Sequence, residues 1–325
     1  MQAIVYHRYG SPDVLRLEEV EKPTPGDNEV LVKVQAVSVN ASDWEFLTGS
    51  PLYVRMWGLF KPKHRILGSD IAGRVETVGK NVKLFQQGDA VFGDLLESWG
   101  GFADYVCAPA ERLMDKPAGM TFEEAAAVPQ AALVALQGLR DKGAIQPGQK
   151  VLINGAGGGS GSFAVQIAKL FGAEVTGVDS TEKLDMMRSI GADRVIDYTQ
   201  EDFTKNGHQY DLILDLVASH SIFAYKRALS PKGAYVMVGG SMTHIFQTLI
   251  LGSLISMTGT RKMGILGAKA NKDLAVMIEM MESGKVVPVI DKQYPLSEVP
   301  EALRYLGAGH AKGKVVITVA HNKRT

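Results

Sequence analysis

Short runs of alternating apolar and polar residues dominate the first part of the chain. Gln2–Tyr6 and Glu29–Val37 alternate in the way that a strand with one buried face requires. Ile71–Gly79 and Asp89–Gly93 continue the series, and glycine-containing turns separate these runs. Short strands with frequent glycine predict a compact β-rich domain, similar to a barrel.

After Thr121 the pattern changes to alternating strands and helices. Thr121 and Glu124 have the spacing of a helix capping box, and Ala125–Leu139 is predicted to be helical in spite of Pro129. This βαβ rhythm predicts a doubly wound parallel sheet. Its strands are expected at Lys150–Asn154, Glu174–Val178, Arg194–Asp197, Asp211–Leu216 and Ala234–Val238, with helices at Ser162–Phe171 and Glu182–Ile190.

Near the C-terminus the chain returns to the earlier β pattern. Val286–Ile290 and Lys314–Val319 are predicted strands, and Ser297–Leu306 between them is a predicted helix. We therefore expect an α/β protein whose chain ends share one domain, residues 1–123 and 287–325. Residues 124–286 are then an inserted domain built on the parallel sheet.

The composition gives no strong electrostatic bias. Lys plus Arg and Asp plus Glu number 35 each, so the formal net charge is zero. A chain without a basic field offers no surface for nucleic acid. The single cysteine, Cys107, excludes an intramolecular disulfide and a cysteine-based zinc site. With no apolar signal segment at its start, the chain is predicted to be cytoplasmic.

The most hydrophobic stretch of the chain is Ile245–Met257, with Gln247 and Thr248 inside it. It is shorter than the ~20 residues that a membrane-spanning helix needs. We expect a buried helix or a subunit contact here, and no stable membrane insertion.

A glycine-rich segment follows the first strand of the predicted parallel sheet. Ala156, Gly158 and Gly161 fit the spacing of a dinucleotide-binding loop, with alanine in the first place. Glycine lets the backbone approach a pyrophosphate at the helix N-terminus, although a tight strand-to-helix turn also uses it. Because a strand precedes and a helix follows, we predict a Rossmann unit. The loop residues expected to contact the cofactor are Ala156, Gly157, Gly158, Gly159, Ser160 and Gly161.

The residues after the second strand give conflicting evidence on the cofactor. Asp179 lies about 20 residues beyond the loop, where an acid holds the ribose 2′-hydroxyl of NAD and repels the 2′-phosphate of NADP. Ser180 and Lys183 follow, and either side chain can bind that phosphate. Alternatively, Ser180 caps the next helix and Lys183 lies on its solvated face.

Motifs along nearly the whole chain resemble those of the medium-chain dehydrogenase/reductase superfamily, closest to its zinc-independent quinone oxidoreductase and enoyl-reductase branch. The resemblance implies a GroES-like β-rich catalytic domain made from both chain ends, with an inserted doubly wound Rossmann domain. Its marks include Gly10–Leu15, Val39–Asp43, Leu67–Gly73, Gly100–Tyr105, Ala125–Pro129 and Ile190–Tyr198.

The same resemblance predicts that no zinc is bound. Zinc alcohol dehydrogenases carry a cysteine in the place of Asn40 and a His-Glu pair in the place of Ser69 and Asp70. The third ligand would fall near Pro129 and Gln130, and neither is a metal ligand. Catalytic zinc needs about three protein donors, so no metal-ligating residue is predicted.

Relatives that use NADPH place a small hydroxyl residue, a lysine and a tyrosine around its 2′-phosphate. Ser180, Lys183 and Tyr198 match those places, whereas Asp179 departs from the usual small residue. We therefore expect a slight preference for NADPH over NADH. Gly239 and Gly240 at the carboxyl edge of the sheet, and Lys312 in the returning segment, are further expected cofactor contacts.

The resemblance implies hydride transfer from NAD(P)H to a quinone or an α,β-unsaturated carbonyl, with Asn40, Asp43 and Gln130 near the nicotinamide. Asn40 can donate a hydrogen bond to the carbonyl oxygen, where charge develops. Asp43 is either part of the site or a structural tie for its loop. Tyr53 is either a proton donor or pocket wall.

Several alternatives stay open. Trp44, Trp57 and Phe60 either line an apolar substrate pocket or pack in the core. A zinc-free alcohol or aldehyde dehydrogenase and a non-catalytic dinucleotide sensor are the alternative functions. Sheet-edge dimers are usual in the superfamily, so a homodimer is expected.

Overall fold

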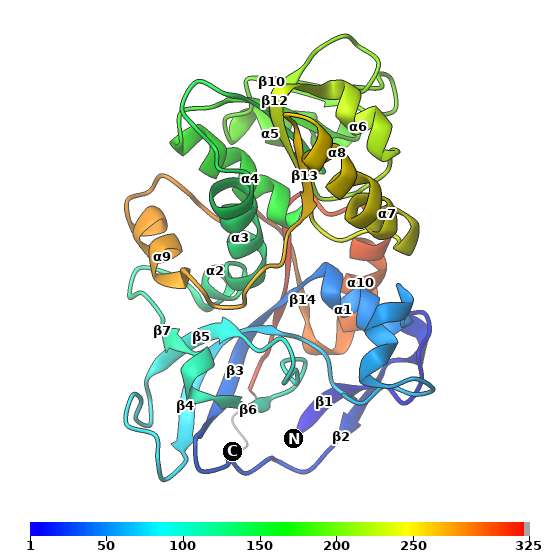
Figure 1. Ribbon diagram of the computed structural model, residues 1–325. Coiled ribbons are helices and arrows are strands. Elements are labelled where there is room, and N and C mark those ends of the chain that lie inside the picture. The colour runs from blue at the N-terminus through cyan, green and yellow to red at the C-terminus, as the bar shows by residue number, and fades with distance from the viewer. Residues whose placement is uncertain (322–325) are drawn as a thin grey trace. The chain divides into compact units, whose positions relative to one another are not determined.

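The computed structural model describes residues 1–321. The chain forms two compact units, which Figure 1 shows. Unit 1 comprises Met1–Gln130, Ala270–Ile278 and Ile290–Thr325, and unit 2 comprises Ala131–Lys269 and Glu279–Val289.

Unit 1 is built on a seven-stranded sheet in the order β14-β15-β3-β4-β5-β7, with β6 also paired to β3. A two-stranded sheet of β1 (Gln2–Val5) and β2 (Arg16–Glu19) accompanies it. The long strand β3 has antiparallel neighbours β15 and β4, so these three strands alternate in direction. The strand bounds are β3 Glu29–Val39, β4 Asp70–Val78, β5 Ala90–Asp94, β6 Tyr105–Pro109, β7 Met114–Asp115, β14 Ile290–Pro295 and β15 Lys314–Thr318.

The expected β-rich unit is confirmed, with one strand misplaced. Val286–Val289 is not a strand, and β14 begins at Ile290. Pro288 lies in this segment, and proline has no N–H to donate to a sheet. Of this apolar run only Val286 is fully buried, and Val287 is 51% exposed, so the run marks neither a strand nor a continuous core segment.

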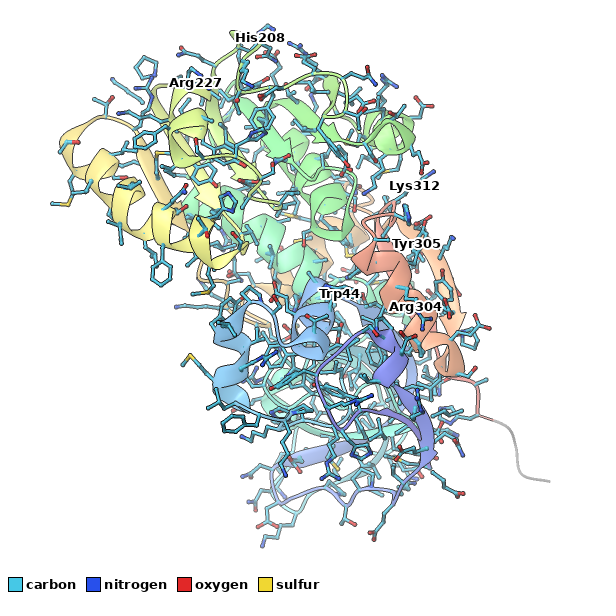
Figure 2. The ribbon with its side chains drawn as sticks, turned by 90° about the vertical axis from the view of Figure 1, so that its right-hand side faces the viewer. Trp44, His208, Arg227, Arg304, Tyr305 and Lys312 are labelled. Atoms are coloured by element: carbon cyan, nitrogen blue, oxygen red, sulfur yellow. The ribbon has the colours of Figure 1, made fainter. Side chains whose placement is uncertain are left out.

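Two helices of unit 1 pack against each other through a glycine. Helix α1 (Ala41–Thr48) contacts α10 (Val299–Gly307), and a Cβ placed on Gly307 would lie 2.3 Å from the ring of Trp44. Figure 2 shows Trp44 beside the helix that carries Arg304 and Tyr305. Trp44 thus packs against the core, which answers one of the alternatives left open above.

The predicted helix at Ala125–Leu139 is interrupted by Pro129. The capping box of Thr121 and Glu124 is confirmed and opens α2 (Phe122–Ala126), but a new helix, α3, begins at Pro129 and ends at Leu136. Proline is tolerated in the first turn of a helix and breaks a helix interior, because it lacks the N–H that the preceding turn requires.

Unit 2 contains the parallel sheet that the alternating pattern predicts. Its strand order is β10-β9-β8-β11-β12-β13, which is that of a doubly wound fold whose order reverses between β8 and β11. Every neighbouring pair is parallel. The strands are β8 Lys150–Asn154, β9 Glu174–Asp179, β10 Arg194–Asp197, β11 Tyr210–Asp215, β12 Leu229–Met237 and β13 Lys262–Ile265.

The helices of unit 2 follow its strands. They include α4 Gly159–Leu170, α5 Leu184–Ser189, α6 Ile222–Ala228, α7 Met242–Gln247 and α8 Ser253–Thr258. The apolar stretch Ile245–Met257 is helical, but Phe246, Leu249, Ile250 and Leu254 are exposed rather than buried. Within residues 1–321, no helix is long and apolar enough to cross a membrane.

Candidate functional site

The glycine-rich loop of unit 2 turns sharply between β8 and α4. The N–H groups of Gly155 and Ala156 both donate to the carbonyl of Val178, at 2.9 and 3.1 Å. Gly155 has φ +86°, in the left-handed region that favours glycine. The loop is therefore fixed against the end of β9 before the helix begins.

Helix α4 starts so close to this turn that only glycine fits at its third position. A Cβ on Gly161 would lie 2.1 Å from the carbonyl oxygen of Gly155, which no real contact tolerates. A Cβ on Gly158 would meet only that same oxygen, at 3.5 Å. The 12-residue helix begins at Gly159. Its unpaired N–H groups and dipole suit an anion such as a pyrophosphate.

Asp179, at the end of β9, is bonded to the glycine loop. Its Oδ2 accepts the N–H of Gly157 at 2.9 Å, and its Oδ1 accepts the N–H of Ser180 at 2.9 Å. The Lys183 ammonium lies 3.2 Å from the same Oδ1, and both side chains are buried. Lys183 is therefore on the buried side of its segment, where it balances the charge of Asp179.

The four residues expected around the 2′-position come together. The N–H of Tyr198 donates to the carbonyl of Asp179 at 3.1 Å, and β10 pairs with β9 so that Asp197 lies opposite Asp179. The Tyr198 side chain is 60% exposed and so is free to contact a ligand. Ser180 and Lys183 complete the group.

The remaining expected cofactor residues are not part of this group. Gly239 and Gly240 follow β12, and both have positive φ, at +68° and +134°. A Cβ on Gly239 would meet nothing within 4 Å, so the backbone there is open to a ligand. Lys312 belongs to unit 1, where its N–H donates to Asp291 Oδ2 at 2.8 Å.

Sequence reasoning missed Asp215, at the carboxyl end of β11. This buried carboxylate accepts Asn154 Nδ2 and the hydroxyl of Tyr235, both at 2.8 Å, and the N–H of Ala218 at 2.9 Å. It joins β8 to β11 at the point where the strand order reverses. An acid directly after the apolar run Leu212–Leu214 was the signal for it.

A second polar cluster lies in unit 1 and is almost completely buried. Asp43 accepts the N–H of Asn40 on one carboxylate oxygen and the N–H of Gly68 on the other, each at 2.8 Å. Both oxygens are engaged by the main chain, so Asp43 ties the start of α1 to the segment before β4. The structural alternative for Asp43 is the one that this geometry favours.

The side chain of Asn40 is held by two residues that sequence reasoning did not include among the catalytic candidates. Lys314 Nζ donates to Asn40 Oδ1 at 2.5 Å, and Asn40 Nδ2 donates to Asp70 Oδ2 at 3.0 Å. Asp70 Oδ2 also accepts the N–H of Gln130 at 3.0 Å. The antiparallel pairing of β15 and β4 with β3 brings Asn40, Lys314 and Asp70 together, because β3 ends at Val39 while β15 begins at Lys314 and β4 begins at Asp70.

Burial changes the acid–base properties of this cluster. It raises the pKa of Asp70 well above its ordinary value, and the nearby charge of Asp94 raises it further. It also raises the pKa of Asp43 to about 7. The pKa of Lys314 is lowered by burial, against the opposing attraction of the three carboxylates. The cluster is a low-dielectric site in which hydrogen bonds act strongly on a developing charge.

Tyr53 and Gln130 each have a side-chain partner. The Tyr53 hydroxyl donates to Glu45 Oε2 at 3.2 Å, and burial together with the Glu45 charge raises the pKa of Tyr53 to about 12. A phenol whose proton is held in this way is a weak acid. Gln130 Oε1 accepts the hydroxyl of Ser42 at 2.9 Å.

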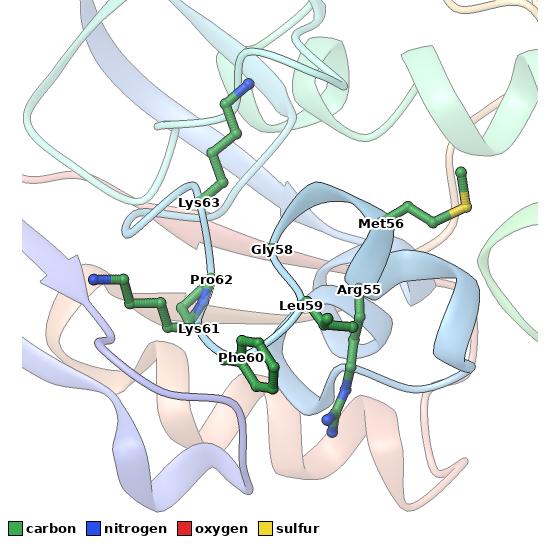
Figure 3. Close-up of a pocket in the computed structure, with 8 residues that line it drawn as sticks. All are labelled: Arg55, Met56, Gly58, Leu59, Phe60, Lys61, Pro62 and Lys63. Atoms are coloured by element: carbon green, nitrogen blue, oxygen red, sulfur yellow. The ribbon is translucent and has the colours of Figure 1, made fainter.

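The loop after Tyr53 forms an apolar hollow of about 1040 Å³, which Figure 3 shows. Leu59 and Phe60 line it, and Phe60 is 90% exposed. Phe60 is therefore placed in a pocket wall, whereas the side chain of Trp57 lies outside the part of the chain that the structure describes.

Comparisons with known proteins agree with this architecture. Residues 26–118 match the family described as alcohol dehydrogenase GroES-like domain, and residues 190–317 match the family described as zinc-binding dehydrogenase. The 2-methylene-furan-3-one reductase of Solanum lycopersicum is 35% identical over 333 residues, which cover 98% of this chain and 79% of that protein. The chloroplastic NADPH-dependent alkenal/one oxidoreductase of Arabidopsis thaliana is 33% identical, with the same two shares covered.

A solved structure has the same architecture as this chain. The quinone oxidoreductase from Coxiella burnetii superposes with a TM-score of 0.86 and is 28% identical, and the match covers 98% of this chain and 99% of that one.

The residues of the cluster do not fit the zinc that one family description implies. Asn40 Oδ1, which would have to serve as a ligand in place of the cysteine of zinc enzymes, already accepts a hydrogen bond from the Lys314 ammonium. No group of three histidine, cysteine, aspartate or glutamate residues able to hold a metal ion occurs among residues 1–321. A cation next to a ligand atom opposes metal binding, so no reaction step is assigned to a metal.

Two glycine substitutions separate the shape of the loop from its role in binding. Gly161→Ala is expected to lower the free energy of unfolding by roughly 1–3 kcal/mol, because its Cβ overlaps the Gly155 carbonyl. Gly158→Ala is expected to leave stability nearly unchanged, because its Cβ would make only an ordinary contact, 3.5 Å from the Gly155 carbonyl oxygen. It is expected to weaken NADPH binding, because the added methyl group lies at the helix N-terminus where the pyrophosphate would bind. Thermal unfolding and fluorescence titration with NADPH measure the two effects. Equal stability of the two variants would contradict the close approach at Gly161.

Proposed function

Because the chain belongs to the medium-chain dehydrogenase/reductase superfamily, we propose that it is an NAD(P)H-dependent oxidoreductase that reduces quinones or α,β-unsaturated carbonyls. The observation that carries this proposal is the buried Asn40 amide, held in place by charged partners in a cluster with no metal-ligand set. The names of the relatives, which include a furanone reductase and an alkenal/one oxidoreductase, support the substrate class.

The nicotinamide supplies the hydride, and the protein's part is to bind, orient and stabilise charge. Hydride addition to a conjugated carbon leaves negative charge on the carbonyl oxygen. An amide nitrogen has two N–H groups, and Asp70 takes one from Asn40. The second N–H of Asn40 is proposed to donate to the substrate oxygen, in a buried site where such a bond is strong.

Asp43, Gln130 and Tyr53, the other expected catalytic residues, are proposed to support the site without reacting themselves. Asp43 fixes the backbone that carries Asn40, and Gln130 is tied to the same cluster through Asp70. The Tyr53 hydroxyl donates a hydrogen bond to Glu45, so Tyr53 is assigned to the pocket wall rather than to proton transfer.

The enzyme is proposed to work without zinc. Conjugation already makes the acceptor carbon electrophilic, so a hydrogen-bond donor is enough to stabilise the enolate or hydroquinone oxygen. The Lys314 ammonium beside Asn40 supplies fixed positive charge within the cluster.

NADPH is proposed as the preferred cofactor, by a small margin. An unpaired acid at the end of β9 would repel a 2′-phosphate, but the buried ion pair with Lys183 neutralises Asp179. Ser180 and the exposed Tyr198 lie next to this pair and can hydrogen-bond to phosphate oxygens.

A homodimer in the cytoplasm is proposed as the form of the protein. Strand β13 is at the edge of its sheet, and α8 contacts it. Phe246 of α7, Leu254 of α8 and Ile250 in the helical turn between these helices are exposed. A sheet edge and an apolar patch together favour association with a second copy. The cytoplasmic location rests on the single cysteine of the chain.

The proposal is tested with substrates that differ only in conjugation. Oxidation of NADPH is followed at 340 nm with but-3-en-2-one and with its saturated counterpart butan-2-one, and then with 1,4-benzoquinone and propanal. We expect kcat/KM to be at least about a hundredfold higher for the conjugated ketone, which corresponds to ~2.7 kcal/mol. Turnover of propanal alone would indicate an alcohol dehydrogenase-like enzyme that reduces aldehydes to alcohols. Tight NADPH binding with no turnover would indicate a dinucleotide sensor.

The cofactor preference is tested by Lys183→Met. This change leaves the Asp179 charge uncompensated, so NADPH is expected to bind at least about tenfold more weakly, whereas NADH affinity changes much less. Lys205→Met, at an exposed lysine of the same unit, is the control and is expected to bind both cofactors normally. An equal loss for the two cofactors would show that Lys183 does not act at the 2′-position.

A further inference from the structure

Lys314 is an unusual residue for the position it occupies. It is the first residue of β15, it is 2% exposed, and apolar strand residues Val315 and Val316 follow it. A fully buried lysine is rare unless it is paired, because removing its charge from water is costly. Its hydrogen-bond partner is Asn40, from a strand end 274 residues away in the sequence.

The chemistry of the two partners fixes the orientation of the Asn40 amide. A lysine ammonium only donates, so the amide must present Oδ1 to Lys314. The Asp70 carboxylate accepts, so the amide must present Nδ2 to Asp70. An amide rotated by 180° would place two donors together on one side and two acceptors on the other. The two flanking groups therefore exclude the rotated form.

We propose that Lys314 and Asp70 are positioning residues, which act together through Asn40 to aim its remaining N–H at the oxygen of the substrate. This inference rests on the proposed function, in which that N–H stabilises the developing charge. It assigns to Lys314 a part in the reaction that is exerted through its hydrogen bond to Asn40.

The surrounding charges explain why the amide is held from both sides. Asp43 and Asp94, like Asp70, are buried and attract the Lys314 ammonium. Asp43 is held by the main-chain N–H groups of Asn40 and Gly68, so it cannot swing to replace Asp70. Asp94 Oδ1 accepts the N–H of Leu96 at 2.7 Å. Asp70 is the one of the three carboxylates that accepts a bond from the Asn40 side chain.

The backbone keeps this geometry rigid. Val39 pairs with Val315 and Ser38 pairs with Asp70, so the three residues project from neighbouring positions at one end of the sheet. A donor aimed by three paired strands loses little orientation during turnover. Displacement of a reacting group by about 1 Å can cost about a hundredfold in rate.

A double-mutant cycle between Lys314→Met and Asn40→Ala tests the inference. Rates are measured with but-3-en-2-one at saturating NADPH. Asn40→Ala is expected to lower kcat about a hundredfold, as the loss of an oxyanion donor does. Lys314→Met alone is expected to lower kcat at least about tenfold, with less than about a threefold change in KM and in the Kd of NADPH. In the Asn40→Ala background, Lys314→Met is expected to have no further effect.

The outcomes separate the inference from the proposed function. If Asn40→Ala leaves kcat unchanged, the donor role of Asn40 is wrong. If Asn40→Ala lowers kcat but Lys314→Met does not, only the positioning inference is overturned. Equal losses from Lys314→Met in both backgrounds would show a structural role that does not pass through Asn40, and would also overturn it.

A charge-balanced variant covers the case in which Lys314→Met fails to fold. Asp70→Asn with Lys314→Met removes both buried charges and keeps the side-chain sizes similar. The same loss of kcat is expected, again absent when Asn40 is alanine, and wild-type kcat in this variant would overturn the inference. Lys33→Met, at a partly exposed lysine on β3, is the control for stability and activity.

Discussion

The buried contact between the Asn40 amide, the Lys314 ammonium and the Asp70 carboxylate is the constraint on which the proposed site depends. Each of these groups loses its water on folding, so each must find a partner inside the protein. Once Lys314 and Asp70 are buried, the polar group between them has to accept a hydrogen bond on one side and donate one on the other. An asparagine amide meets that requirement, and its second N–H is the one that we propose donates to the substrate.

The same requirement, that a buried charge must have partners inside the protein, applies to Asp179 in unit 2. Asp179 is buried at the end of β9, and it is satisfied by Gly157, by Ser180 and by Lys183. The acid therefore holds the glycine loop in shape while its charge is balanced from within. In both units a buried lysine balances the charge of a buried acid. In the proposed function, that balance bears on cofactor choice in unit 2 and on the orientation of the Asn40 amide in unit 1.

Local signals made part of this structure predictable. The glycine loop and the capping box at Thr121 are encoded within a few residues, and the parallel sheet follows from alternating strands and helices. The pairing of Lys314 with Asn40 is not encoded locally, since it arises from the register of β15 on β3. From the sequence, Asp70 stands out only because it occupies a position where zinc enzymes carry a metal ligand. Its actual partners depend on the register of β4 on β3.

The fate of the hydride tests the central claim most directly. The protein is incubated with but-3-en-2-one and NADPH that carries deuterium at the transferable C4 position, and the product is examined by NMR. A zinc-free site that stabilises an enolate oxygen predicts butan-2-one with deuterium on the former β-carbon. Deuterium on the carbonyl carbon, with the double bond intact in an allylic alcohol, would contradict the account.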